Sequence, residues 1–197
     1  MGRKPAFNKE EAIQGALRAF WIHGYDKTSL EDLLGAMGIK TSSFYNTFQS
    51  KEALFFEVLQ YYRQSLGSQR LNYLRDKDLS AREALLKYFD HLVYHSDRTG
   101  YPSGCFMMKT AANLSDPDST VGREVTIAIT NLRKGFEVAL QRGIQSKELR
   151  KDLNVEESAK LLMTAAYGLS VLLRTKTSKK ELLSTAHALI DMLTSKL

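Results

Sequence analysis

The sequence predicts an all-α protein with a three-helix N-terminal head and a larger body of about six helices. Apolar residues recur at helical spacing along almost the whole chain, and capping or turn residues bound each periodic segment. The chain has 197 residues, 43% of them hydrophobic, which is enough to bury a substantial core. We expect the head to span residues 1–50 and the body residues 51–197.

The first expected helix ends near Gly24 and carries one apolar face. Its expected role is to support the two helices that follow. Five residues make this face: Ile13, Ala16, Leu17, Phe20 and Trp21. Before this helix, Arg3 and Lys4 form either a basic arm that reaches the minor groove of DNA or a solvated tail.

Residues 28–51 predict two short helices around a tight turn, followed by the start of a longer helix. Thr28 or Ser29 is suited to cap the first short helix, and Gly38 stands where the chain must reverse in a left-handed conformation. Phe44 and Phe48 are spaced to anchor the second helix. The outward residues are then Lys40, Thr41, Ser42, Ser43, Tyr45, Asn46 and Thr47. Such side chains can reach phosphates and base edges, and no carboxylate interrupts them.

The body is expected to contain six further helices, at residues 50–75, 80–95, 105–114, 119–145, 155–174 and 178–195. The first of them should connect the head to the body. The last two are strongly apolar, and small residues such as Ala165 and Gly168 allow close helix approach. These two helices either only close the core or also pair with a second copy, and we expect a homodimer with a four-helix interface.

Several residues recur together at the spacing of a known domain: Phe20, Gly24, Tyr25, residues 28–34, residues 38–48 with Tyr45, Ser50, Lys51 and Glu52. On these residues, roughly the first 55 positions resemble the DNA-binding domain of the TetR family of bacterial transcriptional regulators. The resemblance implies a recognition helix over residues 40–46 in the major groove. One departure is that Ser42 or Ser43 stands where many members carry glycine.

The resemblance also implies which residues contact double-stranded DNA. Base or phosphate contacts fall to Lys40, Thr41, Ser42, Tyr45 and Asn46, with Ser43 on the same polar face. Thr28 and Lys51 are expected to hold backbone phosphates at helix N-termini. The implied protein is a dimeric repressor on a palindromic operator, with two readers one helical turn of DNA apart, which a small effector releases.

Two features of the body are candidates for sensing that effector. Its many aromatic and methionine residues either enclose an apolar ligand pocket or only form core. Cys105, the only cysteine, begins an expected helix with Lys109 one turn along and Arg98 in the preceding loop. A helix N-terminus and nearby cations favour a thiolate that senses electrophiles or oxidants. The segment from Gly104 to Phe106 resembles that of thiol-responsive TetR-type regulators, although a lone cysteine is commonly a small buried hydrophobe.

Other classes of protein find less support in the sequence. No apolar run reaches the length of a transmembrane helix and the N-terminus lacks a signal peptide, so we expect a cytoplasmic protein without a membrane partner. His91 and His95 have the spacing of a metal pair, but no third ligand is evident, and we expect neither metal nor cofactor. The net charge of +6 suits a nucleic-acid partner. However, the first 51 residues contain seven basic and five acidic residues, so this charge is not concentrated in the head.

Two alternative functions remain open from the sequence. One is an interaction protein that keeps this fold without specific DNA binding. The other is an enzyme that uses Cys105 as nucleophile with His91 or His95 as base, although the chain lacks a nucleophile elbow, a phosphate loop and a metal signature. We expect the regulator rather than an enzyme.

Overall fold

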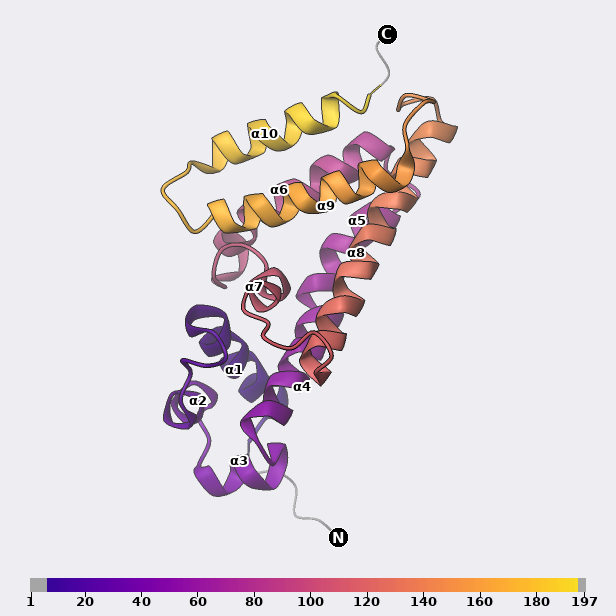
Figure 1. The fold of residues 1–197 in the computed structure, drawn as a ribbon. Helices are drawn as coiled ribbons and strands as arrows, with labels where there is room; N and C mark the ends of the chain where they lie inside the picture. Colours follow the sequence, from indigo (N-terminus) through magenta and orange to yellow (C-terminus); the bar gives the residue numbers. More distant parts are fainter. Residues whose placement is uncertain (1–6, 195–197) are drawn as a thin grey trace.

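The computed structural model describes residues 7–194, which form helices joined by short loops (Figure 1). The predicted all-α class is confirmed. Within the described residues, pairing of strand type is limited to one isolated bridge between Leu149 and Thr194. Arg3 and Lys4 lie outside the described residues.

The head consists of α1 (Lys9–His23), α2 (Leu30–Met37) and α3 (Thr41–Phe48). Ser29 caps α2, and its capping box is completed by Asp32, whose carboxylate accepts from the Ser29 backbone N–H at 2.8 Å. Gly38 ends α2 with a left-handed φ of 63°, a conformation that costs glycine little. The predicted turn between the two short helices is therefore confirmed.

The body comprises α4 (Lys51–Gln64), α5 (Leu66–Arg75), α6 (Ala81–Thr99), α7 (Phe106–Ala112), α8 (Thr120–Gln145), α9 (Val155–Leu172) and α10 (Lys179–Asp191). Figure 1 shows α4 leaving the head and running beside α8, while α9 and α10 lie at the far end of the body. The short helix α7 lies between α1 and the rest of the body. Besides α4, α7 is therefore an element through which head and body meet.

The prediction of one continuous helix over residues 50–75 is wrong, because α4 and α5 are separated at Ser65. Ser65 has φ −101° and ψ −90°, outside the helical region. Its hydroxyl donates to the carbonyl of Tyr61 at 2.6 Å, and the Ser68 hydroxyl donates to the Ser65 carbonyl at 2.7 Å. Hydroxyls that bond to helical carbonyls in this way bend or break helices. The break precedes α5, whose buried residues are Arg70 and Leu74.

The buried side chains form two hydrophobic clusters rather than one. The first joins the head to α4, α7 and the start of α8, and contains Trp21, Phe44 and Phe106. The second fills the body between α6, α8, α9 and α10, and contains Phe89 and Phe136. Cys105 packs against both clusters. The thiol therefore lies where the two cores meet.

Two glycines of the head provide a matched test of its packing. A Cβ on Gly15 would lie 2.1 Å from the carbonyl oxygen of Ala36, because α1 and α2 are in close contact there. A Cβ on Gly35 would meet no atom within 4 Å. We predict that Gly15→Ala lowers the free energy of unfolding by about 2 kcal/mol through overpacking. Gly35→Ala should raise it by about 0.5–1 kcal/mol through helix propensity. Urea unfolding of both variants checks this pair, and equal effects would contradict the packing described for α1 and α2.

Candidate functional site

The outward face of α3 is polar and carries no carboxylate. Phe44 and Phe48 are buried and attach α3 to the core of the head. Five of the six predicted contact residues around α3 are exposed and the sixth, Ser43, is half-buried; the exposed residues are Lys40, Thr41, Ser42, Tyr45 and Asn46. Tyr45 is 51% exposed, and its ring rests edge-on against Phe44. The predicted residues thus lie together on one face.

The N-terminus of α3 has no side-chain cap from Lys40, its N-cap residue. By contrast, Ser29 caps α2 and Ser50 caps α4, each through a side-chain oxygen. The N-cap side chain therefore forms no hydrogen bond with the first backbone N–H groups of α3. Unpaired N–H groups at a helix N-terminus suit a phosphate oxygen.

The two residues predicted to hold phosphates differ in their environment. Thr28 is 0% exposed, and its hydroxyl donates to the carbonyl of Gly24 at 2.6 Å. Thr28 thus braces the loop between α1 and α2 from within, and Ser29 is the cap of α2. Lys51 opens α4 with its ammonium 4.5 Å from the centroid of the Tyr25 ring. Lys51 is half-buried.

The C-terminal end of α1 is embedded in the body through Trp21. This side chain is fully buried and contacts rings from three other elements of the body. Its ring centroid lies 5.4 Å from that of Tyr62 on α4, 5.7 Å from that of Phe106 on α7 and 6.0 Å from that of His95 on α6. The Tyr101 ring stacks against Trp21 as well, with the centroids 5.6 Å apart. Such aromatic packing fixes the angle at which the head leaves the body.

Two cations from the body also bind the end of α1. Lys109 on α7 donates to the carbonyls of Trp21 and Ile22 at 2.6 and 2.9 Å, and Arg174 donates to the carbonyl of Trp21 at 3.3 Å. These are the carbonyls that a helix C-terminus leaves unpaired, and cations stabilise that end of the helix dipole. Burial, followed by the charges of Arg174 and Lys27, lowers the pKa of Lys109. Nothing in the sequence pattern indicated this role, because the partners are 88 residues apart.

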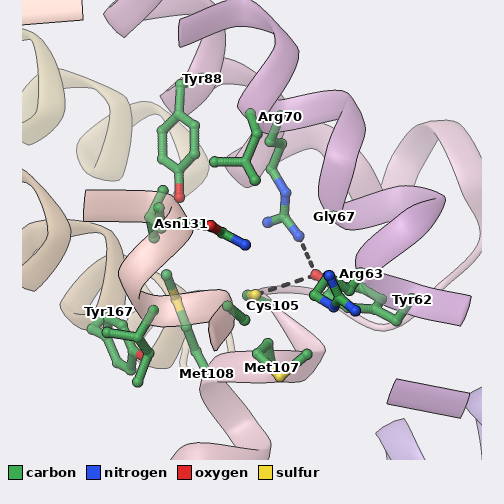
Figure 2. Close-up of a pocket in the computed structure, with 14 residues that line it drawn as sticks. Tyr62, Arg63, Gly67, Arg70, Tyr88, Cys105, Met107, Met108, Asn131 and Tyr167 are labelled. Carbon is green, nitrogen blue, oxygen red and sulfur yellow. Dashed lines mark hydrogen bonds between the residues drawn. The ribbon is translucent and has the colours of Figure 1, made fainter. Parts of the chain in front are cut away.

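A cavity of about 60 Å³ lies beside Cys105, between α4, α5, α7 and α8 (Figure 2). The Cys105 sulfur is 3.2 Å from the hydroxyl of Tyr62, and the same hydroxyl accepts a hydrogen bond from Arg70. Thiol and guanidinium thus share one phenol at the wall of the cavity. Its other lining residues include Arg63, Tyr88, Met107, Met108, Asn131 and Tyr167.

The phenols around the cavity keep their protons at neutral pH. Burial raises the pKa of Tyr62 well above its ordinary value, against the opposing charge of Arg70. Burial also raises the pKa of Tyr88, and it raises that of Tyr167 to about 12. The walls therefore present O–H donors.

Cys105 is held at a fixed distance from α9. Its backbone N–H donates to the Ser170 hydroxyl at 2.9 Å. Gly104 has φ +91°, and a Cβ there would come within 2.8 Å of both the carbonyl and the hydroxyl oxygen of Ser170. Glycine is required at 104 on both counts. Arg98, expected near the thiol, instead pairs with Asp90 at 2.9 Å.

His91 and His95 bind each other rather than forming a site with other ligands. His91 Nε2 is 3.3 Å from His95 Nδ1, and both side chains are buried. Among residues 7–194 no group of three His, Cys, Asp or Glu side chains is arranged to hold a metal ion. Burial lowers the pKa of each histidine to about 4, and the positive charge of Arg70 adds to the effect. No helix in the same part of the chain combines the length and apolarity needed to cross a membrane.

Two family models match the chain. The model described as "Bacterial regulatory proteins, tetR family" matches residues 12–58. The model described as "Tetracyclin repressor-like, C-terminal domain" matches residues 81–189. Together they span both the head and most of the body.

Individual relatives agree with these matches. The chain is 30% identical over 189 residues to the HTH-type transcriptional repressor ComR of Escherichia coli (strain K12), covering 94% of this chain and 88% of that protein. It is 25% identical over 168 residues to the repressor DhaR of Mycobacterium sp. (strain GP1), covering 85% and 82% of the two chains. A solved structure of the regulator CifR, a cysteine mutant complexed with 26 bp operator DNA, is 30% identical with a TM-score of 0.85, covering 96% of this chain and 98% of that one.

The histidine pair predicts a pH dependence of stability. Because the pKa of both histidines is about 4 in the folded chain and about 6.5 when unfolded, the unfolded chain binds protons first as the pH falls. The histidine contribution should be complete above pH 6.5 and lost between about 6.5 and 4, with a slope of up to about 1.4 kcal/mol per pH unit for each histidine. The free energy of unfolding, measured with urea at several pH values in this range, should depend less steeply on pH in the His91→Gln/His95→Gln double variant. His187→Gln, which changes an exposed histidine, should keep the pH dependence of the wild type.

Proposed function

The chain belongs to the TetR family of bacterial transcriptional regulators and is a DNA-binding regulator, and we propose that it represses transcription as a homodimer on a two-fold symmetric operator. The observation that carries this proposal is the exposed, carboxylate-free face of α3. The relatives ComR and DhaR, both repressors by name, support repression rather than activation. CifR, similar to this chain over nearly its whole length, is complexed with operator DNA, which favours DNA binding over the interaction-protein alternative.

We assign the base contacts to the α3 face, with Thr41, Ser42, Tyr45 and Asn46 turned to the major groove. Lys40, Ser43 and the uncapped N-terminus of α3 are suited to phosphate oxygens, as is the ammonium of Lys51. Thr28 is left out of this interface because its side chain is buried. Its proposed role is to hold α2 in place behind the reader.

The division of labour follows the two predicted parts of the chain. We assign DNA reading to residues 1–50, and effector sensing and dimerisation to residues 51–197. The helix α4 serves both parts, because Leu54, Phe55 and Leu59 pack in the cluster of the head. We place the protein in the cytoplasm, with its DNA. The family is regulatory, which favours this function over a cysteine-dependent enzyme.

The proposed dimer face is formed by α9 and α10. Leu161, Val171 and Leu172 of α9 are 50%, 60% and 42% exposed, although they are large apolar residues. Ala165 and Gly168 lie between them at helical spacing, and α10 adds the exposed Ser184 and Ala188. An apolar stripe with small residues at its centre lets two helix pairs approach closely. A second copy of the chain would cover it.

The proposed release signal is a small electrophile or oxidant at Cys105. The cavity beside Cys105, about 60 Å³, is well below the several hundred Å³ of pockets for drug-sized ligands, so at this site a small reagent is favoured over a bulky apolar ligand. Cys105 contacts Tyr62 through its sulfur and Ser170 of α9 through its backbone N–H. Modification of the thiol adds atoms in this confined space. The neighbouring Phe106 and Lys109 would carry the displacement to the end of α1.

Selection of genomic fragments with the purified protein tests the proposed function. Sequencing of the retained DNA should give one palindromic motif whose half-sites are about one helical turn apart. Recovery of no preferred sequence would overturn the repressor and leave the interaction protein as the better account.

The phosphate contact of Lys51 predicts a change in salt dependence. Lys51→Ala should weaken binding to operator and to unrelated DNA alike. It should also reduce the slope of log K against log salt by about one unit. Fluorescence anisotropy at several salt concentrations measures this slope. Lys151→Ala removes an exposed lysine of the loop before α9 and should leave the slope unchanged. An unchanged slope in Lys51→Ala would contradict the phosphate assignment.

The dimer face predicts which surface charges disrupt assembly. Leu161→Glu or Val171→Glu buries a carboxylate without a partner in the proposed interface, so either change should give monomers. Val138→Glu introduces the same charge at an exposed apolar position of α8 and should leave the dimer intact. Sedimentation velocity distinguishes the two states. Dimers in both α9 variants would place the interface elsewhere.

A further inference from the structure

Arg70 is a buried cation without a counter-ion. Its side chain comes from α5 into the body and is 3% exposed. One guanidinium nitrogen, Nη2, donates to the Tyr62 hydroxyl. The other, Nη1, is buried and has no hydrogen-bond partner. No Asp or Glu among residues 7–194 forms an ion pair with this guanidinium, although ten other ion pairs are present in that range.

The free side of this guanidinium belongs to the cavity beside Cys105. Figure 2 shows the Arg70 head group beside the cavity, between Tyr88, Asn131 and the thiol. The residues lining the cavity include no carboxylate. The hydroxyls of Tyr88 and Tyr167 form no hydrogen bond with other described residues. Guanidinium and phenols therefore offer donors to whatever occupies the space.

An unpaired buried charge is costly, and its retention at this position needs a reason. Taking a guanidinium out of water without an anion is strongly unfavourable. The second arginine at the cavity, Arg63, has its charge balanced by Glu124 at 3.1 Å. Arg70 differs because its missing partner would have to come from the cavity itself. A carboxylate is the group whose two oxygens fit a guanidinium fork best.

The position of the thiol adds a second requirement on the occupant. Arg70 and Cys105 contact the same atom, the hydroxyl oxygen of Tyr62, with the sulfur 3.2 Å from it. Both residues also line the cavity, so a carboxylate bound by Arg70 lies in the space that the sulfur borders. With a cavity of about 60 Å³, the molecule has only a few non-hydrogen atoms.

We propose that Arg70 is the anion-binding residue of the effector site, and that the effector is a small carboxylate whose adjacent carbon is electrophilic. This inference rests on the proposed function and specifies its ligand class, of which short 2-oxo acids are one example. Arg70 binds the carboxylate, and Cys105 attacks the adjacent carbonyl carbon. The sulfur–carbon bond forms, the carbon–oxygen π bond opens and the thiol proton ends on that oxygen. The adduct is a hemithioacetal or hemithioketal and needs no oxidant.

A matched pair of alkylating agents tests this proposal. Iodoacetate and iodoacetamide have nearly the same size, and each transfers its carbon to sulfur with loss of iodide, but only iodoacetate carries a carboxylate. Because Cys105 is the only cysteine, intact-protein mass spectrometry follows both reactions at this atom. The measured quantity is the iodoacetate-to-iodoacetamide rate ratio, divided by the same ratio for the neutral thiol 2-mercaptoethanol. A general effect of Arg70 on thiol reactivity cancels in this ratio.

The full-length wild-type protein should give a normalised ratio of about tenfold or more, as expected for a charge-assisted hydrogen bond. Arg70→Met should bring it to within about twofold of the free thiol. Arg75→Met removes the same charge from an exposed position on α5 and should keep the wild-type ratio, which controls for the net charge of the protein. A wild-type ratio equal to that of the free thiol, or an elevated ratio that persists in Arg70→Met, would overturn the proposal.

A second measurement needs no variant. Acetate should slow the alkylation of wild-type Cys105 by iodoacetamide, whereas acetamide at the same concentration and ionic strength should not. Equal effects of the two would also overturn the anion site. Both measurements are made without DNA. If the fragment selection recovered no operator, the proposed function would be contradicted, but the alkylation ratio would still test the role of Arg70.

Discussion

The insertion of the end of α1 into the body is the interaction on which the rest of the structure depends. Trp21 is buried among rings from α4, α6 and α7, and Lys109 holds the two carbonyls that end the helix. Neither contact lies within the head. The direction in which α3 points is therefore set by residues of the body. In a dimer, the spacing of the two readers would depend on the same contacts.

This junction is continuous with the cavity. Cys105 precedes α7, and Phe106, the first residue of that helix, contacts both Trp21 and Tyr62. The thiol packs against the cluster of the head and that of the body. One short segment, residues 105–109, thus carries both the candidate sensor and the cation that binds the end of α1. A chemical change at the sulfur can therefore reach the DNA-reading head through directly packed residues. In this account α7 has two positions, and modification of Cys105 and DNA binding favour different ones.

The sequence predicts well what local rules decide. The capping residues, Gly38 and the spacing of Phe44 and Phe48 specify the head because each acts on its own turn of helix. The polar face of α3 follows from the same spacing. Prediction failed where hydroxyls decide: Ser65 breaks a helix whose apolar pattern continues. Local rules left Thr28 and Ser29 as alternative caps of α2, and long-range packing buries Thr28 while Ser29 caps the helix.

The candidate sensor was predictable only as a residue, not as a site. Cys105 stood out because it is unique, but its surroundings come from segments far along the chain. Arg70 lies on α5, beyond the break at Ser65, and lines the cavity, and Lys109 turns to α1 rather than to the thiol. Helical periodicity predicts which residues share the buried face of a helix. It does not predict which other element that face packs against.

The most direct test of this account is operator affinity before and after carboxymethylation of Cys105, in the wild-type protein and in Lys109→Met. If α7 transmits the change through the end of α1, modification should weaken wild-type binding by about tenfold or more, the usual size of allosteric coupling. In Lys109→Met, where the hydrogen bonds from α7 to the end of α1 are removed but the contact between Phe106 and Trp21 remains, the same modification should weaken binding by a smaller factor than in the wild type. An equal loss in both proteins would contradict transmission through this junction.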